Sequence, residues 1–219
     1  MAGPRARVLS ENGGQQFWFV LVNQLEHQGG SDETLSWNGQ ANFGGDIHKL
    51  WFKSEGELES GENEAEIQAL YSRAIAPFWN IQGGVRHDVE PDGLNHAVIA
   101  INGLAPYWFE IDASGFLSEE GDLTVRLEAE YELLITQRWI LQPRLELNAA
   151  AQEIRERGLG SGITHLDAGL RLRYAVRREF APYLGVEWQT TLGGTRDQIS
   201  ATGADADELR FLIGLRAWF

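Results

Sequence analysis

The chain of 219 residues carries a formal net charge of −14 at pH 7 and contains no cysteine. The acid excess argues against a nucleic acid partner, because binding to phosphates relies on clustered Lys and Arg. No stretch approaches the roughly 18 apolar residues of a membrane helix. The mean hydropathy of −0.29 suggests a soluble protein, yet a strand of a membrane barrel also averages to neutral, because only every second residue is apolar.

Residues 1–16 are rich in Gly and polar side chains, which is typical of a loose terminus. No basic region followed by an apolar one begins the chain, so an exported protein would here be in its mature form. Residues 17–219 alternate between segments of about ten residues and turns with Gly, Pro or Asp, which predicts about twelve strands and no helix. The predicted strands cover Phe17–His27, Thr34–Phe43, His48–Leu58, Ala65–Ile75, Trp79–Val89, His96–Leu104, Tyr107–Leu117, two strands within Gly121–Ala150, Gly162–Val176, Pro182–Leu192 and Asp207–Phe219.

The hairpin within Gly121–Ala150 shows the alternation most clearly. In its first arm, Leu123, Val125 and Leu127 alternate with charged or polar residues, and the second arm repeats this pattern. Successive side chains of a strand point to opposite faces. Each strand therefore has one apolar face and one charged face.

Two architectures fit this alternation. In a soluble sheet or a calycin-like ligand binder the apolar face is the core, whereas in an outer-membrane barrel it meets lipid and the charged face lines the lumen. Short connections alternate here with long polar ones, as in outer-membrane barrels. The last strand ends on Trp218 and Phe219, which resembles the assembly signal of such proteins. We therefore predict a closed antiparallel all-β barrel with short periplasmic turns and longer extracellular loops.

Several long blocks of sequence resemble the copper resistance protein B family. They cover residues 49–57, 70–77, 84–88, 103–110, 126–147, 178–183 and 216–219. The resemblance implies an outer-membrane protein of copper tolerance that binds or exports copper. It also implies a His- and Met-rich segment before the barrel. The sequence departs from that pattern, because the first His is His27 and the one Met is the first residue. The segment is either removed or absent.

Candidate copper ligands within the barrel are few. Copper(I) prefers thiolate and thioether ligands, whereas copper(II) accepts imidazole and carboxylate. His87, Asp88 and His96 flank the same predicted loop and could converge at the outer mouth of the barrel. His165 and Asp167 share a strand face that points inward if the neighbouring Leu residues face lipid. For each single His the alternative is a polar residue of the rim or lumen.

The inward faces carry both acids and bases. The predicted lumen residues are Glu55, Glu57, Glu110, Asp112, Arg126, Glu128, Glu130, Arg144, Glu146, Arg171 and Arg173. In one interpretation their ion pairs simply fill the barrel. In the other, excess carboxylates lower the energy of a cation in the lumen and repel anions.

No motif indicates an enzyme. The chain has no Gly-x-Ser-x-Gly elbow, no His-Glu-x-x-His and no phosphate loop. Two hypotheses remain: a copper export channel, and a non-conducting barrel that buffers copper mainly through the N-terminal segment. Either would act as a monomer in the lipid bilayer, without a covalent cofactor, with copper ions as ligand and periplasmic copper proteins as candidate partners.

Overall fold

The computed structural model describes residues 16–30, 33–59, 63–91, 93–203 and 205–219. Most of them belong to one 13-stranded sheet. Its strands are β1 (Phe17–Gly29), β2 (Glu33–Gly44), β3 (His48–Leu58), β4 (Asn63–Ala76), β5 (Trp79–Glu90), β6 (Asn95–Ala105), β7 (Phe109–Ser118), β8 (Leu123–Glu130), β9 (Leu133–Leu134), β10 (Trp139–Ala150), β11 (Gly162–Tyr174), β12 (Phe180–Thr191) and β13 (Asp207–Trp218). The predicted loose segment 1–16 lies outside the described residues except for Gln16.

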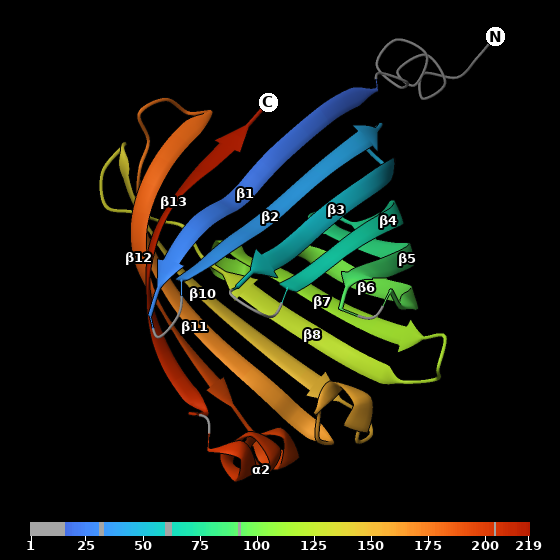
Figure 1. Cartoon of the computed structure of the whole chain (residues 1–219). Helices are drawn as coiled ribbons and strands as arrows, with labels where there is room; N and C mark the ends of the chain where they lie inside the picture. Colours follow the sequence, from blue (N-terminus) through green and yellow to red (C-terminus); the bar gives the residue numbers. More distant parts are fainter. Residues whose placement is uncertain (1–15, 31–32, 60–62, 92, 204) are drawn as a thin grey trace, which may run out of the picture.

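The sheet closes on itself. Neighbouring strands pair antiparallel in the order of the sequence, β1 pairs with β13, and β10 pairs with β11 as well as with β8. Both β8 and β9 pair with β10 in one register, so together they form a single interrupted strand. The prediction of a closed antiparallel barrel of twelve strands is therefore confirmed (Figure 1).

Pro143 explains the interruption between β8 and β9. The backbone N–H of Tyr131 donates to the Pro143 carbonyl over 3.1 Å. In an antiparallel ladder the return bond would run from the N–H of residue 143 to Tyr131, and proline has no N–H to donate. The ladder resumes at Leu133, opposite Leu141.

The apolar side of each strand faces outward. Leu127, Leu145 and Leu170 are each more than 40 % exposed, and Leu215 lies on the same outer face, half-buried. The inward positions instead include buried Arg, Glu and Gln side chains. This is the reverse of a soluble sandwich and is the arrangement that a lipid environment stabilises. Among the described residues, no helix is long and apolar enough to cross a membrane.

The two ends of the barrel differ. Val20 and Phe219 exchange backbone hydrogen bonds of 3.1 and 2.9 Å, so β1 begins where β13 ends. We call this the turn end, and it carries the short connections 45–47, 77–78, 106–108, 135–138 and 175–179. At the opposite end, which we call the loop end, lie the two longest connections, 151–161 and 192–206 (Figure 1).

The longest connection contains a helix, α2 (Gly193–Thr202), which corrects the prediction of a chain without helices. The segment is polar and lacks the apolar stripe by which a surface helix is recognised in a sequence. Its contacts hold it in place instead. The N–H of Gly160 donates to Thr195 Oγ1 over 2.8 Å, and Arg196 pairs with Asp207 over 2.8 Å.

The turn before β7 also differs from the prediction. Residues Pro106–Trp108 form a 3-10 turn, η1, so the strand begins at Phe109 rather than Tyr107. Tyr107 and Trp108 have φ angles of 68° and 67°, which end the extended backbone at this point.

Candidate functional site

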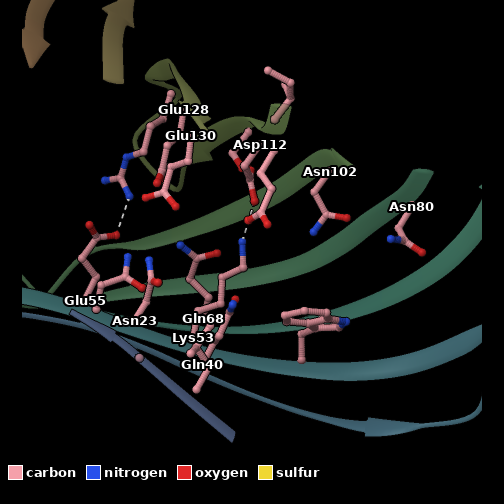
Figure 2. A pocket seen from close by; sticks show the side chains of 18 of the residues that line it. Asn23, Gln40, Lys53, Glu55, Gln68, Asn80, Asn102, Asp112, Glu128 and Glu130 are labelled. Atoms are coloured by element: carbon pink, nitrogen blue, oxygen red, sulfur yellow. Dashed lines mark hydrogen bonds and ion pairs between the residues drawn. The ribbon is translucent and has the colours of Figure 1, made fainter. Parts of the chain in front are cut away.

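A cavity of about 450 Å³ occupies the lumen towards the turn end. Several of its residues lie one or two positions from the short turns, and others lie near mid-strand. Figure 2 shows its polar side chains, which come from strands on both sides of the lumen. The polar and charged residues that line it include Asn23, Asn38, Gln40, Lys53, Glu55, Gln68, Asn80, Asn102, Glu110, Asp112, Arg126, Glu128, Glu130 and Arg216.

One wall of the cavity is acidic. Glu110 and Asp112 of β7 lie directly opposite Glu130 and Glu128 of β8, so each carboxylate faces another across the ladder. Like charges in facing positions destabilise a sheet. Cations offset this repulsion here, because Lys53 pairs with Asp112 over 2.9 Å. On the other side, Arg144 lies 3.0 Å from Glu128 and 3.5 Å from Glu130.

The wall formed by β1, β2 and β4–β6 carries amides. Asn23, Gln40, Gln68, Asn80 and Asn102 extend into the lumen from these five strands (Figure 2). Amide oxygens can accept hydrogen bonds from water or contact a cation, and amide N–H groups can donate. Both walls of the cavity therefore carry oxygen atoms that could contact a cation.

Arg126 lines the cavity near mid-lumen. It extends from β8 across the lumen to Glu55 of β3 over 3.0 Å and to Glu66 of β4 over 3.1 Å. Its guanidinium also lies 5.6 Å from the centre of the Phe116 ring. Both Arg126 and Phe116 line the cavity, whereas Glu66 does not.

Beyond Arg126, ion pairs continue towards the loop end. Arg86 pairs with Glu66 over 2.7 Å and also with Asp88. Asp88 accepts from Arg157 over 2.6 Å, and the His96 Nε2 atom lies 3.1 Å from it. Arg157 belongs to the connection between β10 and β11, so this connection reaches across the mouth to β5.

A second buried network joins the last strands to the first. Arg171 of β11 donates to Glu26 of β1 and to Glu187 of β12, and Tyr183 donates to Glu26 over 2.9 Å. Arg171 and Glu26 are only 2 % and 1 % exposed. These ion pairs fill the lumen beside the cavity.

A third group lies nearer the turn end. Arg173 and Arg216 each donate to Glu132 over 2.6 Å. The predicted lumen residues all lie on the inward face, either along the cavity or in ion pairs beside it. Outside the cavity lining are Glu57, Arg144, Glu146, Arg171 and Arg173.

The structure brings together only part of the predicted metal cluster. Asp88 and His96 are buried and in contact, but His87 lies on the outer face with Val85, where its Nδ1 atom is 3.0 Å from Asn95. The expected convergence of His87 with His96 is therefore wrong. Its physical reason is the register: His96 pairs with Arg86, so adjacent His87 points to the opposite face.

His165 and Asp167 do share the inward face of β11, opposite Asn148 and Glu146 of β10. Neither lines the cavity. Within the described parts of the chain, no three His, Cys, Asp or Glu side chains are grouped so as to hold a metal ion. The roles of His87, Asp88, His96, His165 and Asp167 as copper ligands stay predictions.

Several members of these networks were not predicted from the sequence. Glu26 and Tyr183 were not among the candidates, although the alternation of β1 could have shown that Glu26 faces inward with Gln24 and Gln28. Arg157 carried no such signal, because it lies in an irregular connection. The amides of the cavity were missed because the prediction of the lumen considered charged side chains only.

The comparisons with known proteins agree on a family. The model of the family described as "Copper resistance protein B precursor (CopB)" matches residues 16–219. Copper resistance protein B of Escherichia coli is 44 % identical over 206 residues, which cover 92 % of this chain and 69 % of that protein. A copper resistance protein B homolog of Pseudomonas syringae pv. tomato is 37 % identical, covering 98 % of this chain and 76 % of the relative.

Solved structures of low sequence identity share the fold. The NanC porin aligns with a TM-score of 0.60 at 12 % identity, covering 92 % of this chain and 99 % of that one. The KdgM porin aligns with a TM-score of 0.54 at 12 % identity, covering 93 % and 99 %. At this identity the similarity concerns the barrel architecture alone.

Proposed function

The chain belongs to the copper resistance protein B family, and we propose that its barrel binds copper ions in the lumen cavity, which they enter from the periplasm. The family is one of copper resistance barrels of the bacterial outer membrane and not of enzymes. The observation that carries the proposal is the acidic wall, in which Glu110 faces Glu130 and Asp112 faces Glu128.

The acidic wall supports cation binding because its repulsion is only partly offset. Among the described residues that line the cavity, five carboxylates accompany three cationic side chains, Lys53, Arg126 and Arg216. Arg144, which pairs with Glu128 and Glu130 from outside the lining, is a fourth cation beside this wall. The carboxylates are those of Glu55, Glu110, Asp112, Glu128 and Glu130. A cation between the facing carboxylates would relieve their mutual repulsion. Low-dielectric walls strengthen this attraction relative to bulk water.

The available donors favour copper(II). Carboxylate and amide oxygens line the cavity, and none of the described residues along it is His, Cys or Met. Copper(I) prefers sulfur ligands, whereas oxygen donors suit the divalent ion. A periplasmic copper-carrying protein is a candidate donor of the ion at the turn end.

The binding we propose is weak and exchangeable. No three candidate ligands in the part of the chain that the structure describes are grouped as a metal site. The ion would therefore keep part of its water shell and meet the walls through water and single carboxylates. Sites of this kind fill and empty readily, whereas a tight site would trap the ion.

Copper binding to the purified protein tests the proposal. We expect the double variant Glu110→Gln with Glu130→Gln to bind copper(II) roughly tenfold more weakly, because it removes one facing pair of carboxylates from the wall. Equilibrium dialysis in detergent followed by metal analysis measures the change. Cells that carry this variant should also tolerate less copper than cells with the unchanged protein.

A matched control separates the cavity from the lumen as a whole. Glu57→Gln removes a lumen carboxylate that pairs with Arg210 and does not line the cavity, and it should leave copper(II) binding unchanged. Heat-modifiable migration on a gel establishes that each barrel has folded. Equal binding by the double variant and the unchanged protein would contradict the proposal.

A further inference from the structure

The lumen contains an apolar row at the level where the cavity ends. Leu70, Gly84, Val98 and Phe116 are successive partners across β4, β5, β6 and β7. Leu70, Val98 and Phe116 are buried against one another, and Trp51 of β3 packs against them. The lumen of an outer-membrane barrel is usually polar, so a buried apolar row on its inner wall is unusual.

Two guanidinium groups cover this row. Arg86 lies 4.8 Å and Arg126 lies 5.6 Å from the centre of the Phe116 ring, distances at which a cation is attracted to an aromatic face. Arg126 is also held by Glu55 and Glu66 from the far wall. The strands β5, β6 and β7 lie between β4 and β8 in the sheet, so this contact spans the lumen.

Inward positions of β7 mark where the accessible space ends. Ser114 and Phe116 line the cavity, whereas Ser118, the next inward residue towards the loop end, is buried and does not line it. On the loop-end side of Phe116 lie the Arg86–Asp88–Arg157 ion pairs. On β7 the lining of the cavity thus runs from Glu110, near the turn end, to Phe116, and Arg126 lines it beside Phe116.

We infer that Arg126, held over Phe116 by Glu55 and Glu66, is a gate that stops cations from crossing between the cavity and the loop end. The ion-paired guanidinium occupies the lumen beside Phe116, and the apolar row resists hydration, so each opposes passage. The inference concerns the passage of any cation, and it stands whether or not copper is the ion that the cavity binds.

Removal of Arg126 should open a path. In Arg126→Gln the carboxylates of Glu55, Glu66 and Glu146 lose the cation that they surround. The mutual repulsion of these carboxylates should widen the lumen beside Phe116, and their negative charge should attract cations there. In planar bilayers with potassium chloride and no copper, we expect cation-selective conductance about tenfold above that of the unchanged protein.

A control removes a different lumen cation. Arg173→Gln breaks an ion pair with Glu132, which keeps Arg216 as a partner, and Arg173 does not line the cavity. This variant should leave conductance at the unchanged level. The inference is overturned if folded Arg126→Gln conducts no more than Arg173→Gln, or if the unchanged protein already conducts as an open pore.

Thiol labelling gives a second measurement on barrels that keep Arg126. The chain has no cysteine, so Ser114→Cys and Ser118→Cys each introduce a single thiol of nearly unchanged size on either side of Phe116. A small charged thiol reagent should modify position 114 about tenfold faster than position 118, since only the first lines the cavity. Adding Arg126→Gln should accelerate the reaction at position 118. Equal rates at both positions with Arg126 present would overturn the inference.

Discussion

At the level of single side chains, the two faces of each strand meet different solvents. Leu127 lies in the middle of β8 with its side chain exposed on the outer face, and its neighbours Arg126 and Glu128 point into the lumen. In a soluble protein such exposed apolar side chains would promote aggregation, whereas in a membrane barrel they contact lipid. The outer face therefore tolerates changes among apolar residues and opposes charge.

Leu127→Arg tests this assignment. We expect the substitution to lower the free energy of unfolding by about 2–4 kcal/mol, because a charge near the middle of the bilayer is poorly solvated. Denaturant titration in lipid vesicles, followed by heat-modifiable migration, measures the change. Leu127→Ala is the control for the loss of the side chain and should cost clearly less. Equal stability of Leu127→Arg and the unchanged barrel would mean that position 127 does not face lipid.

Contacts between residues across the barrel could not be predicted from sequence patterns. Alternation assigns Arg171 to the inward face, but it cannot show that Arg171 of β11 meets Glu26 of β1, because the pairing depends on how the sheet closes. The same holds for His87 and His96, whose relative facing depends on the register between β5 and β6. Alternation therefore identifies the inward charges but not their partners.

At the level of elements, the strands were predictable to within a few residues because each has a clear alternation of period two. The bounds of β3, His48–Leu58, agree fully with the prediction. The helix α2 and the turn η1 were missed, since neither carries a periodic apolar pattern. Local contacts and loop geometry stabilise these two elements, and such interactions produce no periodic pattern in the sequence.

The strand β5 contains two adjacent glycines with different surroundings. A Cβ atom on Gly84 would clash with the Ala69 carbonyl oxygen, whereas one on Gly83 would meet nothing closer than 3.8 Å. Gly84 also lies between Leu70 and Val98 in the apolar row. The close approach of β4 and β5 therefore depends on Gly84 and not on Gly83.

Alanine substitutions at these two positions form a matched pair. We expect Gly84→Ala to lower the free energy of unfolding by about 1–3 kcal/mol, because the added methyl group must displace backbone atoms. Gly83→Ala should change it by much less. Urea titration of both variants in lipid vesicles measures the difference. Equal losses of stability would contradict the role that the structure gives to Gly84.

At the level of the whole molecule, the barrel is asymmetric along its axis. The turn end has the short connections and the cavity, and the loop end has α2 and the connection that carries Arg157. In outer-membrane barrels the short turns face the periplasm. We therefore expect the turn end with the cavity to face the periplasm and the ion pairs at Asp88 to lie towards the cell surface.

Epitope tags test this orientation in cells. A tag inserted after Gly203, in the long connection at the loop end, should bind antibody on intact cells, because long loops face outward. A tag inserted after Gln137, in a short connection at the turn end, should bind antibody only after the outer membrane is permeabilised. Labelling of the Gln137 tag but not the Gly203 tag on intact cells would reverse the orientation. Copper would then enter the cavity from outside the cell, and the proposed uptake from the periplasm would fail with it.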